Sequence, residues 1–234
     1  LASTWNLDLV YKEAIAISDE ARALANTMDN YRYLNFWNPM INIARDPRWG
    51  RTQEGYGEDP FLVSRIAVEY IKGLQGKDDK YLKAIASPKH FVANNVDGDR
   101  HFTNSKIDDK ILRDYYFPAF ESSIVEGKAQ GLMSAYNSLN GVPCSSNDLL
   151  LNNILRNEWG FKGHVVSDCG AIYNIHANHF FTETPHQGVA IALKSGTDMN
   201  CGGQYEKYLK EAFEIGLVTE VDINTSLKRI LRSR

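Results

Sequence analysis

The chain has 234 residues, of which 43% are hydrophobic and 24% are charged, and its formal net charge at pH 7 is −3. This is the balance of an ordinary globular domain that is long enough to bury a sizeable core. The sequence has no long basic run, so nothing in it favours a nucleic acid partner. Because no apolar stretch approaches the roughly 20 residues that a membrane-spanning helix needs, we expect no membrane partner.

The chain opens on Leu1 with no secretory leader before it, so we expect it to start inside a longer protein. Its three cysteines, Cys144, Cys169 and Cys201, are too few for a disulfide scaffold, and none belongs to a CxxC pair. The sequence also lacks a phosphate-binding glycine loop. We therefore expect neither a metal site nor a cofactor.

Apolar residues recur at helical or strand spacing along the whole chain. In chain order, helices are predicted over 8–30, over 61–74 after Pro60, from Asp108 to about residue 126 with a kink or restart at Pro118, from Asn147 to Gly160, and over 185–195, 204–215 and 220–232. Short apolar runs predict strands over 84–87, 132–135 and 164–167, and residues 36–43 fit a strand that passes into a loop.

The alternation of strands and helices indicates a parallel α/β sheet. Polar side chains collect directly after the strands, where such sheets bind ligands; they are Lys89, His90, Tyr136, Asn137, Asp168 and Asp198. About five strands are predicted, whereas a closed eightfold barrel usually needs roughly 250 residues. The chain is therefore either a nearly complete TIM-type (β/α) barrel that lacks its beginning, or a shorter open sheet.

Two of these strand ends carry side chains suited to catalysis. Asp168 follows the buried run 164–167, and a carboxylate held rigidly there can be placed accurately against one carbon atom, as a nucleophile must be. The alternative is that Asp168 only caps the next helix. Lys89 and His90 offer hydrogen-bond donors to sugar hydroxyls or to a carboxylate, or else they form a surface pair after an edge strand.

A long loop over residues 42–60 is dense in charge and broken by glycine and proline. Its arginines and acids indicate an ion-pair network that holds the loop, with one arginine reaching the ligand: Arg45, Arg48, Arg51, Glu54, Glu58 and Asp59. Residues 97–101 fit a solvated turn. Aromatic side chains that can stack on a sugar face, although lone aromatics more often belong to the core, are Trp37, Trp49 and Tyr136.

Taken together and in order, these segments resemble glycoside hydrolase family 3. The resemblance runs from about Ala14 to Gly202 and rests on four motifs with the family's order and spacing. The motifs are the loop over 42–60, Lys89-His90-Phe91, residues 133–143 with their Met-Ser-Ala-Tyr-Asn and Asn-Gly-Val-Pro stretches, and residues 163–168. One such motif is weak, whereas four in register favour the nucleophile interpretation of Asp168 over the capping one.

The resemblance implies a catalytic barrel domain over residues 1–234 and a two-step mechanism that retains the configuration of the anomeric carbon. In this mechanism Asp168 attacks the anomeric carbon, and Tyr136 lies beside the nucleophile. Arg51, Lys89 and His90 bind hydroxyls of the sugar in subsite −1. The two carboxyl groups of a retaining enzyme lie roughly 5–5.5 Å apart, so the nucleophile reaches the carbon directly.

Several features resemble the β-xylosidase branch of the family. The β-glucosidases usually carry tryptophan after the nucleophile, whereas this chain has Cys169. Residues 167–169, residues 196–202 and Arg100-His101 also match the β-xylosidase branch, and Trp37 and Arg100 match its substrate-contacting positions. The implied substrate is a terminal non-reducing β-D-xylosyl residue of a xylo-oligosaccharide. Some members of the branch also cleave α-L-arabinofuranosides.

Two departures from the family pattern concern the ends of the chain. The family's first barrel strand, with its acidic sugar-binding residue, should precede Leu1. The general acid/base of β-xylosidases and β-glucosidases sits on a second α/β domain, which should follow residue 234. Without a positioned acid the leaving group departs slowly, at a typical cost of about 10²–10⁴-fold, so the resemblance implies that this fragment alone can be inactive.

Other functions remain as alternatives. A β-glucosidase is one, and an N-acetylhexosaminidase of the same family is another, because Asp99 and His101 superficially resemble the Asp-His dyad of that branch. However, Val-Ala-Asn-Asn at 92–95 replaces the Pro-Gly-His-Gly of that branch. The remaining alternative is a non-catalytic barrel that holds sugar without cleaving it, against which the retention of Asp168 argues.

The cysteines allow a disulfide beside the nucleophile. Cys169 follows Asp168, and Cys201 follows the next strand-end segment, so adjacent strands can bring the two within bonding reach. A bridge would brace these loops and point to an oxidising compartment. We expect instead that both are buried free thiols, as cysteine commonly is, while Cys144 could replace either partner.

Overall fold

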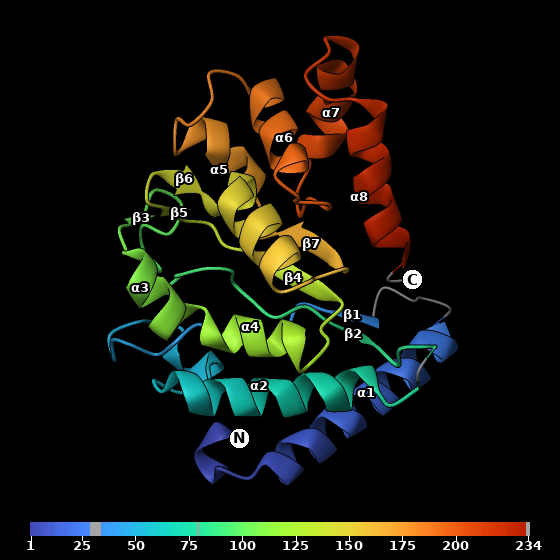
Figure 1. The fold of residues 1–234 in the computed structure, drawn as a ribbon. Coiled ribbons are helices and arrows are strands. Elements are labelled where there is room, and N and C mark those ends of the chain that lie inside the picture. Colours follow the sequence, from blue (N-terminus) through green and yellow to red (C-terminus); the bar gives the residue numbers. More distant parts are fainter. Residues whose placement is uncertain (29–33, 79, 233–234) are drawn as a thin grey trace.

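The computed structural model describes residues 1–28, 34–78 and 80–232, and Figure 1 shows their arrangement. Two parallel strand pairs form the middle of the fold. β1 (Asn35–Phe36) pairs with β2 (Ile85–Ala86), and β4 (Gly131–Ser134) pairs with β7 (His164–Ser167). Single parallel bridges extend and connect these pairs: Met40 with Lys89, Phe91 with Ser134, and Val166 with Met199.

Five strand segments therefore follow one another in chain order as one parallel arc, the last of them at residues 198–199. Helices follow the strands along the chain. Parallel strands in sequential order with helices outside are the arrangement of a TIM-type barrel, so the predicted fold class is confirmed. A small separate sheet of β3 (Asn104–Ser105), β5 (Ser138–Leu139) and β6 (Val142–Pro143) lies next to it.

The helices agree closely with the prediction. They are α1 (Leu7–Met28), α2 (Pro60–Gln75), α3 (Asp109–Ile111), α4 (Pro118–Val125), α5 (Ala171–Ala177), α6 (Pro185–Lys194), α7 (Gln204–Glu214) and α8 (Glu220–Arg232). Two π-helical segments, η4 (Leu112–Tyr116) and η6 (Leu149–Glu158), and three 3-10 turns, η1 (Ala2–Thr4), η3 (Thr52–Glu54) and η5 (Cys144–Ser146), complete the described elements. The last two residues of the helix predicted over 8–30 lie outside the described residues.

Local capping explains several of these boundaries. Asp59 accepts a hydrogen bond from the backbone N–H of Leu62 at 2.7 Å, and Pro60 occupies the first turn of α2. A reciprocal capping box between Thr184 and Gln187 begins α6. The predicted restart at Pro118 is also confirmed, since α4 begins there.

The predicted cap at Asn147 is confirmed, since its side chain accepts a hydrogen bond from the N–H of Leu150 at 3.2 Å. One helix in the second half of the chain was missed. Helix α5 was not predicted, because it is short and follows Gly170. The φ of this glycine is 87°, a left-handed conformation that glycine adopts without strain.

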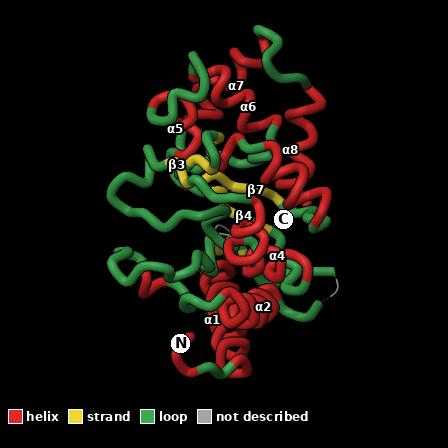
Figure 2. Tube along the Cα trace, turned by 60° about the vertical axis from the view of Figure 1, so that its left-hand side comes forward, coloured by secondary structure: helices red, strands yellow, loops and turns green. Residues whose placement is uncertain are grey.

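Figures 1 and 2 show α1 and α2 at one end of the molecule, α5 to α8 at the other, and β4 and β7 between them. One large apolar core fills the space between α1, α2, α4 and the strands, and a smaller one joins α5 to α8. Phe91 anchors the large core, since its ring lies 5.0 Å from that of Phe120 and 5.7 Å from that of Trp159. The strand residues Leu132 and Val165 belong to the large core, which therefore packs directly against β4 and β7.

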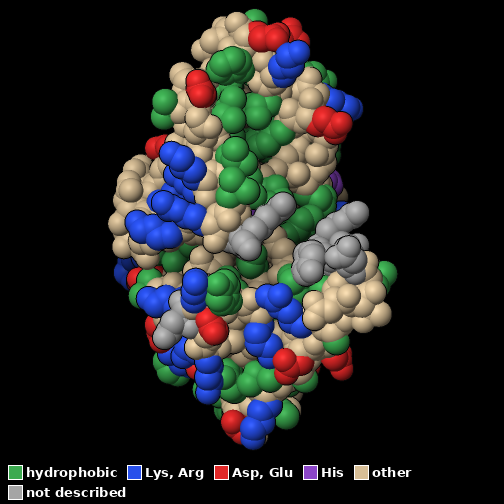
Figure 3. Space-filling view, turned by 90° about the vertical axis from the view of Figure 1, so that its right-hand side faces the viewer, with side chains coloured by type: hydrophobic (Ala, Val, Ile, Leu, Met, Phe, Trp, Pro, Cys, Tyr) green, Lys and Arg blue, Asp and Glu red, His purple; other side chains and the backbone are tan. Residues whose placement is uncertain are grey.

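On the face turned to the viewer in Figure 3, hydrophobic side chains form an upright band in the upper half, with groups of lysine and arginine beside and below it. Exposed apolar side chains of α8 include Val221, Leu227 and Leu231. No described helix is both long and apolar enough to cross a membrane.

Asp198 is the buried electrostatic centre of the C-terminal half. Its Oδ2 accepts hydrogen bonds from Arg156 at 2.7 Å and from the N–H of Val165 at 2.9 Å, and its Oδ1 accepts one from Arg229 at 3.0 Å. The side chain of Asp198 is fully buried, so this ion pair joins η6, β7 and α8 inside the protein. Although Asp198 was grouped with the ligand-facing residues at the strand ends, its carboxylate is engaged in structural contacts.

We predict that Asp198→Asn lowers the free energy of unfolding by about 3–5 kcal/mol, because it leaves the buried guanidinium of Arg156 and the partly buried one of Arg229 without their anion. Urea unfolding followed by circular dichroism measures this loss. Glu158→Gln is the matched control, since Glu158 also accepts two hydrogen bonds from one arginine, Arg113, but on the surface. The control should cost at most about 1 kcal/mol. Equal losses in the two variants would contradict the role of burial.

Candidate active site

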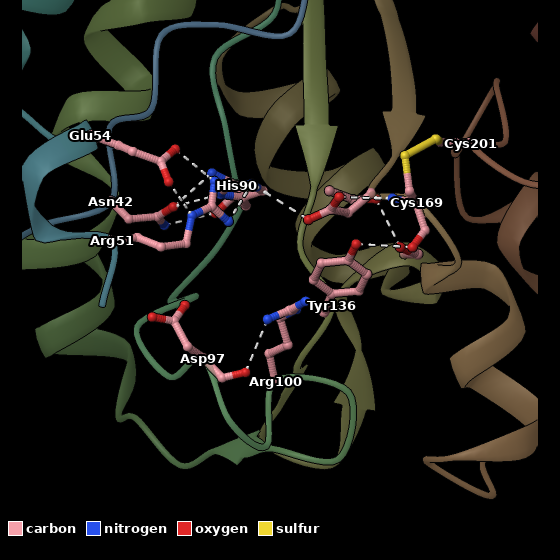
Figure 4. A network of polar contacts seen from close by, with 12 residues as sticks. Asn42, Arg51, Glu54, His90, Asp97, Arg100, Tyr136, Cys169 and Cys201 are labelled. Carbon is pink, nitrogen blue, oxygen red and sulfur yellow. Dashed lines mark hydrogen bonds and ion pairs between the residues drawn. A yellow bond between two sulfur atoms is a disulfide. The ribbon is translucent and has the colours of Figure 1, made fainter. Parts of the chain in front are cut away.

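The loops after β2, β4 and β7 bring the predicted catalytic side chains to one place (Figure 4). His90 follows β2, Tyr136 follows β4 and Asp168 follows β7. The carboxyl ends of parallel strands lie at one edge of the sheet, which explains why residues far apart in sequence meet here. Arg51 reaches the same place from the long loop after β1.

Asp168 is buried, with 7% of its surface exposed. Its Oδ1 accepts a hydrogen bond from the N–H of Cys169 at 2.8 Å. Its Oδ2 lies 3.4 Å from Nε2 of His90 and has no hydrogen-bond partner among the described groups. Asp168 is not the cap of α5, since Gly170 occupies that position and no side chain caps the helix. One carboxylate oxygen is therefore held by the backbone, while the other is buried beside His90 without a hydrogen bond.

Burial and charge act in opposite directions on Asp168. Burial raises the pKa of its carboxyl above the usual value, whereas the N–H of Cys169, the hydroxyl of Tyr136 and the cations of Lys89 and Arg51 partly offset this rise. The net direction is upward because the loss of hydration penalises the charged form most. A carboxylate in this setting is poorly solvated.

His90 is almost completely buried, with 2% of its surface exposed. Burial, followed by the charges of Arg51, Lys89 and Arg100, holds its pKa well below the ordinary value. His90 is therefore neutral at neutral pH, and its 3.4 Å contact with Asp168 is not an ion pair.

Arg51 is fixed by Glu54, which accepts hydrogen bonds from its Nε at 2.7 Å and from its Nη2 at 2.8 Å. This leaves Nη1 directed at Nε2 of His90, at 3.4 Å. Burial lowers the pKa of the neighbouring Lys89, with a further contribution from the charge of Arg51. Within the predicted ion-pair network of the loop, Arg51 pairs with Glu54, whereas Asp59 instead caps α2 and Arg48 pairs with Asp46 on the surface.

Tyr136 and Arg100 form the opposite side of the site. The hydroxyl of Tyr136 donates to the carbonyl of Cys169 at 2.9 Å, and burial, with the nearby charge of Asp168, raises the pKa of Tyr136 to about 12. The guanidinium of Arg100 lies over the Tyr136 ring, 5.4 Å from its centre, and donates to the carbonyl of Asp97 at 3.2 Å. Arg100 and Asp168 therefore both lie beside Tyr136.

The two tryptophans predicted as possible sugar contacts, Trp37 and Trp49, lie in different parts of the structure. Trp49 is buried, and its indole N–H donates to Asp97 at 3.2 Å, so it belongs to the packing of the loops. Trp37 is 37% exposed and borders a hollow between α1 and β1 that also involves Leu24 and Phe36. No described contact joins Trp37 to the residues around Asp168.

Three residues that the sequence did not single out support this site. Asn42 hydrogen-bonds both the backbone and the ring of His90. His179 contacts the carbonyl of Tyr136 at 2.8 Å, and Asn174 contacts the ring of His101 at 2.9 Å. Asn42 lies within the charged loop motif, but a single asparagine carries no signal of which atoms it will bond. Among the described residues, no cluster of three or more histidine, cysteine or acidic side chains could hold a metal ion.

The expectation that Cys169 and Cys201 are free thiols is wrong. They form a disulfide with their Cα atoms 4.4 Å apart, while Cys144 is a buried free thiol. The backbone supports the same link, since the N–H of Gly170 donates to the carbonyl of Cys201 at 2.8 Å. Cys169 is exposed, so the rule that lone cysteines are buried did not apply. The bridge thus fastens the loop that carries Asp168 to the adjacent strand end.

Comparison with known proteins now identifies the family. The model of the glycosyl hydrolase family 3 N-terminal domain matches residues 1–233, so this chain belongs to glycoside hydrolase family 3. It is 39% identical to a probable exo-1,4-β-xylosidase of Aspergillus flavus, over 100% of this chain and 31% of that protein. The chain spans about 30% of the length of the curated relatives that it matches.

Solved structures give the same result. The fold matches a family 3 exo-β-xylosidase in complex with a xylobiose aziridine activity-based probe, with a TM-score of 0.94 and 34% identity, over 99% of this chain and 31% of that one. It also matches a β-glucosidase of Listeria innocua in complex with glucose, with a TM-score of 0.89 and 28% identity, over 99% of this chain and 32% of that one. The barrel therefore resembles relatives named for two different sugars.

We predict that reduction of the disulfide lowers the free energy of unfolding by about 2–4 kcal/mol, because the cysteines are 32 residues apart and the reduced unfolded chain gains the entropy of that open loop. Urea unfolding with and without a phosphine reductant measures the effect. The double variant Cys169→Ser/Cys201→Ser should lose the response to reductant. Alkylation of Cys169 in native, unreduced protein purified under oxidising conditions would show that the bridge is absent.

Proposed function

We propose that this chain is the catalytic barrel of a retaining glycoside hydrolase that removes terminal non-reducing β-D-xylosyl residues from xylo-oligosaccharides. The observation that carries the proposal is the state of Asp168. One of its oxygens is held by the backbone, and the other lacks a hydrogen bond and faces a group of basic side chains at the strand ends.

In the first step Oδ2 of Asp168 attacks the anomeric carbon, and the bond from that carbon to the leaving oxygen breaks. The leaving oxygen takes a proton from a general acid, and the sugar remains bound to Asp168 as an ester. In the second step water attacks the same carbon, gives a proton to the acid's conjugate base and releases Asp168. Two inversions give net retention.

None of the roles assigned to the described residues around Asp168 is that of the general acid/base. We propose that a second domain of a longer protein supplies it, as the family resemblance implies. The share of the relatives' length that this chain spans, about 30%, supports this assignment. Positioning such an acid typically contributes about 10²–10⁴-fold to the rate.

The sugar in subsite −1 is bound, in this proposal, by Arg51, Lys89 and His90, with Tyr136 beside the nucleophile. Arg51 and Lys89 also keep Asp168 ionised against the effect of burial. Arg100 borders the pocket through its contact with Tyr136. Trp37 is the weakest of the proposed substrate contacts, because it lies on the hollow beside α1.

The β-xylosidase names of the relatives and the cysteine after the nucleophile support a xyloside over a glucoside. A β-glucosidase stays as the alternative, because a β-glucosidase also matches the fold. An N-acetylhexosaminidase is disfavoured, since the ring of His101 contacts Asn174 and not Asp99. The disulfide supports an oxidising compartment.

We predict that a 2-fluoro-xyloside with a dinitrophenyl leaving group labels Asp168. Dinitrophenolate is stable enough to leave without a proton, so labelling tests the nucleophile without the general acid. Peptide mass spectrometry should find one fluoro-xylosyl group on Asp168. Turnover of the unfluorinated dinitrophenyl xyloside, glucoside and N-acetylglucosaminide by the full-length protein, measured side by side, ranks the substrates.

Asp168→Asn should abolish both labelling and turnover in the full-length protein while the fold stays intact. The pKa of Asp168 is higher in the folded protein than in the unfolded chain. Its protonated form therefore stabilises the fold at pH values below the unfolded-state pKa, and this stabilisation is lost as the pH rises through the folded-state pKa. The neutral asparagine avoids this loss, so the variant should be more stable than the wild type at pH 7 and lose that advantage in acid. Labelling of another residue would reject Asp168 as the nucleophile, whereas no labelling in the full-length protein would favour the non-catalytic alternative.

We predict that Lys89→Ala lowers kcat/KM for a dinitrophenyl xyloside roughly 10- to 100-fold, because a hydrogen bond from a charged group is worth about 1.5–3 kcal/mol. Steady-state kinetics in the full-length protein measure this change. Lys110→Ala is the matched control on the surface, where Lys110 pairs with Asp114, and should leave kcat/KM unchanged. An unchanged kcat/KM in Lys89→Ala would remove Lys89 from the sugar site.

A further inference from the structure

Asn42 makes three hydrogen bonds with His90, to its backbone and to its ring (Figure 4). Its Nδ2 donates to the carbonyl of His90 at 2.9 Å, and its Oδ1 accepts from the backbone N–H of His90 at 2.8 Å. The same Oδ1 lies 3.0 Å from Nδ1 of the imidazole ring. Asn42 is itself buried, with 2% exposure, so water does not replace these contacts.

The backbone of His90 determines which way the amide of Asn42 points. A flipped amide would place its NH₂ against the N–H of His90 and its oxygen against the carbonyl, and both pairs would repel. The atom facing Nδ1 is therefore an oxygen, which can only accept a hydrogen bond. Nδ1 must consequently carry a proton.

The other ring nitrogen then carries a lone pair, because His90 is neutral. The charged and titratable groups that face the ring are Arg51, whose partner is Glu54, together with Lys89, Arg100 and Asp168. Three of these are cations, and together with burial they disfavour a second proton on the ring. The N–H of Arg51 directed at Nε2 at 3.4 Å is consistent with an acceptor at that position.

We propose that Asn42 is a positioning residue that holds His90 in its Nδ1-protonated neutral form, so that the lone pair of Nε2, which faces Arg51 in this structure, can accept a hydrogen bond from a sugar hydroxyl in place of the long Arg51 contact. The part of this inference that concerns the sugar rests on the proposed function. The part that concerns the tautomer rests on the contacts of Asn42 and on the neutrality of His90. In this form His90 accepts a hydrogen bond that the sugar hydroxyl donates, whereas Lys89 and Arg51 can only donate hydrogen bonds to the sugar.

The tautomer also keeps the nucleophile free. In the opposite tautomer Nε2 would carry the proton and donate it toward Oδ2 of Asp168, which is 3.4 Å away. That hydrogen bond would stabilise the lone pair that the carboxylate uses in attack. A proton on Nε2 would also face the N–H of Arg51, so two donors would repel each other. Asn42 therefore acts on Asp168 through His90, without touching Asp168.

Nitrogen-15 NMR of the histidine rings in the 234-residue chain reads the tautomer without any assay of activity. We expect a protonated Nδ1 and an unprotonated Nε2 for His90 at neutral pH, with His90→Gln identifying the signal among the six histidines. Asn42→Ala removes the acceptor and should shift the population toward the Nε2-protonated form. A protonated Nε2 in the wild-type chain at neutral pH overturns the proposal, even if Asn42→Ala fails to fold.

Asn95→Ala is the matched control, because Asn95 also donates from its amide to a backbone carbonyl, that of Ile43 at 2.7 Å. It should lower stability without changing the tautomer of His90. If Asn42 were only structural, Asn42→Ala would behave in the same way, and the proposal would be rejected.

Asn42→Asp tests the effect on catalysis. A carboxylate still accepts from Nδ1, but its charge raises the pKa of His90, and an imidazolium cannot accept a hydrogen bond. In the full-length protein the acid limb of the pH profile of kcat/KM should therefore move to higher pH, while the Nδ1 proton is retained in the NMR spectrum. An unshifted acid limb overturns the acceptor role of Nε2. Failure of the fluoro-xyloside to label Asp168 would instead reject the proposed function and leave the tautomer result intact.

Discussion

The parallel register between β4 and β7 determines where Asp168 lies. Four residue pairs hold this register, from Gly131 with His164 to Ser134 with Ser167. The N–H of Asp168 then donates to the carbonyl of Ser134 at 3.1 Å, which extends the ladder by one residue. A slip of one residue would turn every side chain of β7 to the opposite face. Gly131 allows the preceding strand segment to pack closely against β4, since a Cβ at this position would collide with the side chain of Ser87.

The site combines two conditions that oppose each other. Burial makes the charged form of Asp168 costly, and the nearby cations reduce that cost without placing a hydrogen bond on its second oxygen. Arg51 can do this because Glu54 occupies two of its nitrogens and leaves the third pointing inward. The ionised form of Asp168 therefore costs the fold stability, and the nearby cations offset only part of that cost.

Much of the fold could be predicted from the sequence, because hydrophobic periodicity and proline or acidic caps specify local structure. The strands over 164–167 and 132–135 and the helix boundaries at Pro60 and Pro118 are examples. The convergence of Arg51, His90 and Asp168 followed from parallel topology. The short helix α5 could not be predicted, because its seven residues after a glycine are too few to show a helical period of apolar residues.

The parts that sequence could not predict depend on distances between residues far apart in the chain. Asn42 and His90 are 48 residues apart, and their contact arises only when Met40 and Lys89 pair. Asp198 resembles a ligand-facing acid in sequence, but two arginines from other elements surround it. The disulfide likewise required knowledge of which strand lies beside β7.

The disulfide has a consequence for how this barrel can vary. Cys169 and Cys201 enclose α5 and α6 in a covalent loop whose two ends are fastened beside Asp168. Insertions, deletions or grafted segments can change the length of that loop, yet the positions where it leaves and rejoins the strands are fixed by a bond. Evolution or engineering can therefore vary this segment while the carboxylate of Asp168 stays in place.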